Sequence, residues 1–268
     1  MNLAHKTVLL TGAAHGLGRE LAHLLDREGC SLYLVDRDTP GLDTVKAALT
    51  SPAVTLTCDL ADPAQRRALI AAFASQTDRL DILIHCAGVG SHSRLTQMSV
   101  DEVERVMQVN ALAPLELTVG LRPLLPADGL IVHIGSVAGE LRLPSMGLYA
   151  ASKAALHTFS ESIALEGVRT LLVILGALRG TDFVRSIEHP HRGQPGWYRR
   201  LDVPVETASR HIVRAMKRGQ SRLVLPRWYP VVFFLTRLFY PAMKSLSFCN
   251  YLPKRRPSTN FTLRLRCR

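Results

Sequence analysis

Tyr149 and Lys153 are the residues of this sequence best suited to move a proton, and they stand four positions apart. Residues with this spacing lie on one face of a helix, so the two side chains would project together. A free tyrosine has a pKa of about 10 and is a poor base at neutral pH, but a nearby ammonium group lowers that pKa. The pair predicts a phenol that exchanges a proton with an alcohol or alkoxide while a hydride moves.

Ser136 precedes Tyr149 by 13 residues and directly follows an apolar, strand-like stretch. In a parallel sheet, ligands bind in the crevice at the carboxyl ends of the strands. A hydroxyl group there could hydrogen-bond the oxygen atom of a substrate. A tyrosine and lysine at this spacing occur by chance on many surface helices, so the argument depends on the other motifs standing in the right order.

A glycine-rich stretch, Thr11-Gly-Ala-Ala-His-Gly-Leu-Gly18, lies between the first expected strand and the first expected helix. Glycines let such a turn bend tightly and approach a pyrophosphate, which then meets the free N–H groups of the helix start. An acidic residue, Asp36, ends the second strand, where a carboxylate can accept hydrogen bonds from an adenosine ribose and repel a 2′-phosphate. Asp36 therefore favours NAD, whereas Arg37 and His15 argue for NADP. The alternative is that Asp36 only shapes its turn.

Strand-like and helix-like segments alternate along the chain, which predicts right-handed βαβ units and a doubly wound parallel sheet between two helical layers. The expected strands are 7–10, 31–35, 54–57, 80–85, 130–134, 171–175 and 223–225. Expected helices include 42–49 and 149–165. Two further helices are expected to begin after Asp62, which would be an N-cap followed by Pro63, and at Ser99, which has capping-box spacing to Glu102. The simplest division is one domain over residues 1–226, followed by an apolar-aromatic segment and basic tail over 227–268.

Together these motifs resemble the short-chain dehydrogenase/reductase family, over roughly residues 6–226. The resemblance implies a Rossmann-type fold and a catalytic tetrad of Asn110, Ser136, Tyr149 and Lys153, with Asn110 in a helix kink that supports a proton relay. It also implies contacts to NAD or NADP. Those contacts are expected at Thr11, Gly12, His15, Gly16, Leu17, Gly18, Asp36, Arg37, Asp59, Leu60, Ala87, Gly88, Tyr149, Lys153, Gly176 and Thr181.

Three departures from the family pattern bear on activity. The usual Asn-Asn-Ala-Gly reads His85-Cys86-Ala87-Gly88, the segment before Gly167 is about four residues short, and the Pro-Gly after the sixth strand is Leu175-Gly176. We interpret His85 as structural, and we expect no metal site. These departures motivate a rival hypothesis, that of a catalytically weak dinucleotide sensor or scaffold. Because the tetrad is intact, we expect an enzyme that interconverts an alcohol and a ketone or aldehyde.

The substrate is expected to be small to medium in size and lipophilic, since the variable segment 182–201 contains Phe183, Ile187, Trp197 and Tyr198. Aromatic side chains there could equally well just close the pocket. The family is often dimeric or tetrameric, which implies a homo-oligomer.

Seven of the eleven net positive charges lie in residues 244–268, next to the aromatic-rich stretch 228–243. The stretch is too short and interrupted for a membrane span. Segment 228–268 could bind an anionic membrane peripherally, or pack on the body of the protein with a solvated tail. Nucleic acid is not expected, because the aromatics do not interleave with the charges. An odd number of cysteines, five, without paired spacing favours free thiols in the cytoplasm.

Overall fold

The computed structural model describes residues 1–181, 183, 202–236 and 238. Contacts divide the chain into two compact units, Met1–Tyr229 and Pro230–Arg268. In the part of the chain that the structure describes, no helix has the length and apolar character needed to cross a bilayer. The first unit contains the fold that positions the candidate site.

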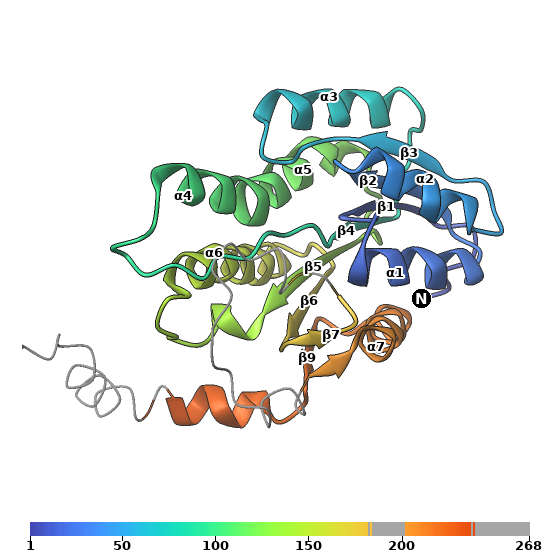
Figure 1. The fold of residues 1–268 in the computed structure, drawn as a ribbon. Coiled ribbons are helices and arrows are strands. Elements are labelled where there is room, and N and C mark those ends of the chain that lie inside the picture. Colours follow the sequence, from blue (N-terminus) through green and yellow to red (C-terminus); the bar gives the residue numbers. More distant parts are fainter. Residues whose placement is uncertain (182, 184–201, 237, 239–268) are drawn as a thin grey trace, which may run out of the picture. The chain divides into compact units, whose positions relative to one another are not determined.

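A sheet of seven parallel strands forms the centre of the first unit, in the order β3-β2-β1-β4-β5-β6-β9 (Figure 1). Its strands are nearly continuous apolar runs because both faces of the sheet are covered. Their bounds are β1 Thr7–Thr11, β2 Ser31–Asp36, β3 Val54–Thr57, β4 Ile82–His85, β5 Leu130–Ser136, β6 Thr170–Leu175 and β9 Arg222–Leu225. This architecture confirms the predicted doubly wound α/β fold.

The helices and short turns complete the unit. They are α1 Gly16–Arg27, α2 Thr39–Ala47, α3 Pro63–Ala74, α4 Val100–Met107, α5 Ala113–Leu121, α6 Gly147–Leu165 and α7 Val205–Lys217. Between α4 and α5 lies a π-helical turn, η1, at Gln108–Leu112, and short 3₁₀ turns occupy η2 Arg122–Leu124 and η3 Val137–Gly139. A separate pair of two-residue strands joins β7 Leu178–Arg179 to β8 Val203–Pro204.

Two hydrophobic cores separate the helices into layers on opposite faces of the sheet. Val8 and Leu10 of β1 belong to one core, which also holds buried side chains of α1, α2 and α7. The intervening Leu9 belongs to the other core, with side chains of α3 and α5. Successive side chains of a strand point to opposite faces, so alternation along one strand produces the three-layer arrangement.

Local capping signals account for several helix starts. The Asp62 carboxylate accepts hydrogen bonds from the backbone N–H groups of Ala64 and Gln65, and the Ser99 hydroxyl accepts one from Glu102. The helix expected at 42–49 instead begins at Thr39, because the Asp38 side chain caps it. The fifth strand runs two residues further than expected, to Ser136, where it pairs with Leu175.

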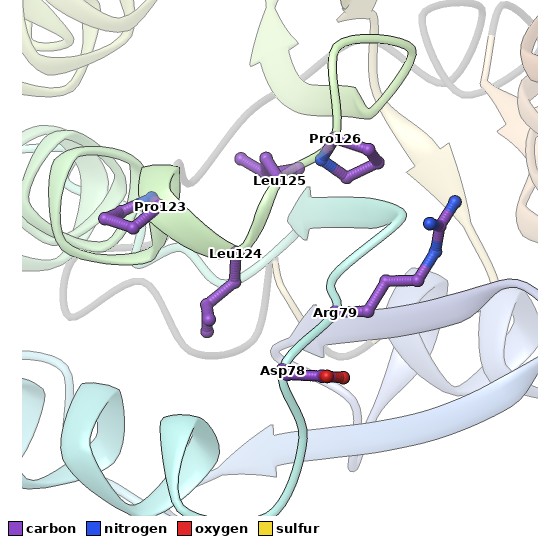
Figure 2. Close-up of a pocket in the computed structure, with 6 residues that line it drawn as sticks. All are labelled: Asp78, Arg79, Pro123, Leu124, Leu125 and Pro126. Atoms are coloured by element: carbon purple, nitrogen blue, oxygen red, sulfur yellow. The ribbon is translucent and has the colours of Figure 1, made fainter.

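A surface hollow of about 310 Å³ lies before strands β4 and β5 and is lined by Asp78, Arg79 and residues 123–126 (Figure 2). It is therefore at the amino edge of the parallel sheet. Since ligands of open α/β sheets bind at the carboxyl edge, this hollow is not the expected crevice.

Candidate active site

The face of α6 that packs on β5 brings the proposed acid/base residues together. Tyr149 and Lys153 are both buried on this helix. The Lys153 Nζ donates a hydrogen bond of 2.9 Å to the backbone oxygen of Ile134 in β5, and it lies 6.0 Å from the centroid of the Tyr149 ring. The side chain of Ser136, the last residue of β5, lies near enough to the Tyr149 phenol to lower its pKa in part. One strand and one helix thus place a hydroxyl, a phenol and an ammonium group next to one another.

Burial shifts the pKa values of both Tyr149 and Lys153. Burial raises the pKa of Tyr149 to about 12, and the Ser136 side chain only partly opposes it. Burial also lowers the pKa of Lys153 to about 8, against a smaller opposite effect of Cys86. Loss of hydration thus sets the direction of the shift of the phenol pKa, and the lowering of that pKa by the Lys153 ammonium stays a prediction.

Asn110 lies in the π-helical turn η1, where its side chain is completely buried. Its amide oxygen accepts a hydrogen bond of 2.8 Å from the Val89 N–H, and its amide nitrogen donates to the Val89 oxygen and to the Ser152 hydroxyl. A Cβ at Gly88 would lie 3.4 Å from both Asn110 Oδ1 and Lys153 Nζ. The chain after β4 therefore runs directly against two of the four tetrad residues.

The glycine-rich turn connects β1 to α1 as predicted. Gly12 and Gly16 have positive φ angles of 70° and 48°. A Cβ at Gly12 would lie 2.7 Å from Ala87 Cα, and one at Gly18 would meet the carbonyl oxygen of Gly12. Gly12 therefore accepts only glycine, because a side chain would strain its backbone and collide with Ala87, and a side chain at Gly18 would collide with the turn itself.

The start of α1 suits an anion. His15 is its N-cap residue and makes no capping side-chain hydrogen bond, and the first turn, which includes the buried Leu17, has no acidic residue. Thr11 fixes the approach of the neighbouring strand, because its hydroxyl accepts hydrogen bonds from the N–H groups of Cys86 and Ala87. The cradle and the open N–H groups together fit a dinucleotide pyrophosphate.

Asp36 ends β2 beside this turn and shapes it. Its two carboxylate oxygens accept hydrogen bonds of 3.1 Å, one from the Ala14 N–H and one from the Asp38 N–H. The Nε2 atom of His15 lies 2.6 Å from an oxygen of Asp38. Asp38 thus adds a second carboxylate at the edge where an adenosine ribose would lie, next to Arg37. The sequence Asp38-Thr-Pro is a typical helix start, so this N-cap could have been recognised from the sequence.

Asp59 and Leu60 follow β3 at the same edge of the sheet. Asp59 accepts a hydrogen bond from the Ala61 N–H, and the Leu60 side chain is buried. The Leu60 carbonyl oxygen accepts a 2.6 Å hydrogen bond from Arg66, whose side chain is only 1% exposed. Arg66 also contacts Gln108 in η1 and both carboxylate oxygens of Glu116. It links the Asp59–Leu60 loop to the turn that carries Asn110.

A family model described as "short chain dehydrogenase" matches residues 6–191. The chain belongs to the short-chain dehydrogenase family. Among curated relatives it is 34% identical over 173 residues to a dehydrogenase/reductase SDR family protein 7-like of Drosophila melanogaster, covering 61% of this chain and 53% of that protein. It is also 34% identical over 177 residues to the ketoacyl reductase HetN of Nostoc, covering 63% and 60%. The chain thus spans a little over half the length of these relatives.

Solved structures share the fold. A short-chain dehydrogenase/reductase of Burkholderia phymatum in complex with NAD has a TM-score of 0.78 at 22% identity, covering 98% of this chain and 100% of that one. A short-chain dehydrogenase of Sphingobium yanoikuyae in complex with NADPH has a TM-score of 0.74 at 23% identity, covering 96% and 100%.

The structure shows what surrounds two of the places where the sequence departs from the family pattern. His85 lies at the end of β4, donates or accepts a 2.9 Å hydrogen bond with Thr118, and stacks on His133. Burial holds its pKa well below the usual value. Gly176 packs against Tyr229, because a Cβ there would lie 2.8 Å from the ring of that tyrosine.

The segment after β7 contains Thr181, the last of the expected cofactor contacts, and Phe183 of the expected substrate segment. Thr181 packs over Gly16, whose Cβ would lie 3.2 Å from the Thr181 methyl group. Phe183 reaches the catalytic side, with its ring centroid 6.0 Å from that of Tyr149. Ile187, Trp197 and Tyr198 lie outside the described residues. Within the described residues, no group of three or more His, Cys, Asp or Glu side chains could hold a metal ion.

Proposed function

We propose that this chain is an NAD(P)-dependent oxidoreductase that interconverts an alcohol with a ketone or aldehyde. The observation that carries the proposal is the convergence of Ser136, Tyr149 and Lys153 at the carboxyl end of β5. Ser136 would orient the substrate oxygen, and Tyr149 would donate or accept its proton. Lys153 would bind the cofactor ribose and favour the phenolate, while Asn110 would support the relay of the proton.

The nicotinamide cofactor would supply or accept the hydride. The glycine cradle would hold its pyrophosphate, and Asp36 would accept hydrogen bonds from its adenosine ribose. We propose a preference for NAD, which the second carboxylate of Asp38, beside Asp36, supports. Two negative charges at this edge would repel the 2′-phosphate of NADP.

The substrate is proposed to be small to medium in size and lipophilic. Phe183 packs near the Tyr149 ring, so the carbon skeleton beside the reacting oxygen would meet an aromatic surface. Such a surface binds apolar groups and excludes water from the reacting atoms.

Turnover measured by nicotinamide fluorescence with a panel of aliphatic and aromatic ketones tests the function. Tyr149→Phe should lower turnover by a factor of about 10² to 10⁴, the usual contribution of a positioned acid/base group. Tyr33→Phe is the matched control, since Tyr33 of β2 packs on Phe73 of α3 and lies outside the site. Equal activity of Tyr149→Phe and wild type would refute the catalytic role. Cofactor binding without turnover of any substrate by the wild type would favour the sensor or scaffold.

We also propose that segment 228–268 attaches the protein peripherally to anionic membranes, as an appendage to a catalytic domain over residues 1–226. Apolar side chains of the described part of this segment are exposed, among them Val231 at 63% and Phe234 at 67%. Val231→Asp with Phe234→Asp in the full chain should reduce co-sedimentation with phosphatidylserine vesicles. The control carries Leu95→Asp and Val100→Asp, which are apolar positions elsewhere that are at least as exposed. Equal sedimentation of the two variants would exclude this attachment.

A homo-oligomer and a cytoplasmic location complete the proposal. Val119 of α5 and Leu165 of α6 are 69% and 92% exposed, so neighbouring helices offer apolar surface to a second copy. Light scattering of wild type against Val119→Asp should show the loss of the assembly. Cys30, Cys58 and Cys86 are free thiols, and burial raises the pKa of each, to about 12, 11 and 12. Unreactive free thiols are compatible with a reducing compartment.

A further inference from the structure

We infer that His157 is a positioning residue that holds Ser136 in place for the proposed reaction. His157 lies one helical turn after Lys153 on the face of α6 that packs on β5. Its Nε2 atom accepts a 3.2 Å hydrogen bond from the backbone N–H of Ser136. The helix therefore contacts the end of β5 at two backbone groups, through Lys153 at Ile134 and through His157 at Ser136.

Two glycines make room for this imidazole. A Cβ at Gly135 would collide with His157 Nε2, and a Cβ at Gly139 would lie 2.7 Å from its Cε1 atom. The ring therefore fills a slot between the residue before Ser136 and the end of η3. The Ser136 hydroxyl accepts a hydrogen bond from the Ala138 N–H within this turn. The His157 side chain thus packs against the backbone both before Ser136, at Gly135, and after it, at Gly139.

The hydrogen bond to Ser136 fixes the tautomer of His157. Because Nε2 accepts from an N–H group, the ring proton of the neutral imidazole lies on Nδ1. Nδ1 is buried and makes no hydrogen bond within the described structure, and the nearest carboxylate oxygen, Oε1 of Glu140, is 3.4 Å away. Arg222 pairs with the same oxygen at 3.2 Å. The Glu140 carboxylate thus favours the tautomer that leaves Nε2 free to accept.

Two substitutions of His157, by Gln and by Asn, test the two ring nitrogens separately. The amide oxygen of Gln reaches the place of Nε2 and can still accept from Ser136, whereas the shorter side chain of Asn reaches only the place of Nδ1. His157→Gln should retain turnover within about threefold of wild type. His157→Asn should lower kcat/KM for the ketone by about 10- to 100-fold, the effect of misplacing a reacting group by about 1 Å. The Kd for NADH should remain unchanged in both variants.

A second measurement does not depend on activity. Hydrogen exchange of the Ser136 amide should be slow in wild type and in His157→Gln, and faster in His157→Asn. If His157→Asn does not fold, the comparison of wild type with His157→Gln decides. A fast-exchanging Ser136 amide in folded wild type, or equal turnover of the Asn and Gln variants, would overturn the inference. The inference rests on the proposed function, whose own failure would appear as no turnover by wild type with the Ser136 amide still protected.

Discussion

The ammonium nitrogen of Lys153 lies 2.9 Å from the carbonyl oxygen of Ile134, although the two residues belong to a helix and a strand. This bond satisfies a buried donor and holds the long side chain in one conformation. Lys153 is therefore oriented by the protein's own backbone beside Tyr149 and Gly88. The position of the Lys153 side chain therefore depends on β5 as much as on α6.

Lys153 should make stability depend on pH. Its pKa is lowered to about 8 from 10.5. Between these values Lys153 is protonated in the unfolded chain but not in the folded chain, so the contribution of this residue to the free energy of unfolding should rise with pH. The rise should be of the order of 3 kcal/mol, at about 1.4 kcal/mol per pKa unit. The buried thiols of Cys30, Cys58 and Cys86 oppose this rise above pH 9, so the measured quantity is the difference from Lys153→Met. In urea unfolding across this interval, the free energies of wild type and of the exposed-site control Lys46→Met should both rise relative to that of Lys153→Met. A rise of equal size in all three would contradict this assignment.

Asp36 should control the choice of cofactor. Asp36→Asn removes the negative charge while an amide oxygen can still accept a backbone hydrogen bond. The ratio of the Kd values for NADP and NAD should fall about tenfold, equivalent to about 1.4 kcal/mol. Nicotinamide fluorescence measures both values without turnover. Asp43→Asn, an exposed position in α2, should leave the ratio unchanged. If Asp36→Asn leaves it unchanged too, Asp36 only shapes the turn.

The stacked pair His85–His133 should limit stability in acid. Burial lowers the pKa of His133 to about 3, with smaller effects of Lys153 and His157, and it lowers that of His85 as well. Below pH 6.5 the unfolded chain takes up protons that the folded chain does not, so stability should fall with decreasing pH. His133→Leu should reduce this slope by about 1.4 kcal/mol per pH unit. Thermal unfolding at a series of pH values measures it, with His5→Asn at an exposed position as control. An unchanged slope in His133→Leu would count against buried titration.

Arg66 should contribute more to the free energy of unfolding than its neighbour Arg67. Removing Arg66 leaves the Leu60 oxygen, Gln108 and Glu116 without the contacts described above. Arg66→Met should lower the free energy of unfolding by about 2 kcal/mol, because the buried Leu60 oxygen loses a hydrogen bond to a charged group, whereas the half-exposed Glu116 can be hydrated. Arg67→Met, exposed on the same helix, should change it by less than about 0.5 kcal/mol. Equal denaturation midpoints for the two variants would disprove the linking role.

The sequence was sufficient to predict the parts of the fold that depend on local pattern. The alternation of apolar runs identified the strands of the sheet, and the caps Asp62 and Ser99 set helix starts within the chain. The glycine turn was recognised because its tight backbone requires glycine, and Asp36 was singled out because it is an acidic residue at the end of the second strand. The start of α2 was missed although Asp38 and Pro40 carry the same kind of capping signal.

Residues whose roles depend on tertiary packing could not be found in this way. Arg66 stands in a Gln-Arg-Arg run that is typical of a solvated helix face, and nothing local distinguishes it from Arg67. His157 becomes important only because Gly135 and Gly139, more than 15 positions earlier, open a slot for its ring. The raised pKa of Tyr149 likewise reflects burial, which the spacing of Tyr149 and Lys153 does not reveal.

The contacts between β5 and α6 also have a consequence for the order of folding. Lys153 and Ile134 are 19 residues apart, and His157 and Ser136 are 21 apart, whereas the Cys86 N–H reaches Thr11 across 75. Closing the longer loop costs about 1 kcal/mol more chain entropy. We expect β5 and α6 to acquire native structure before the glycine-rich turn packs against the chain after β4. Pulse-labelling of amide hydrogens during refolding should therefore show protection of the Ser136 amide earlier than that of Cys86. Simultaneous protection would show that the two regions condense in a single step.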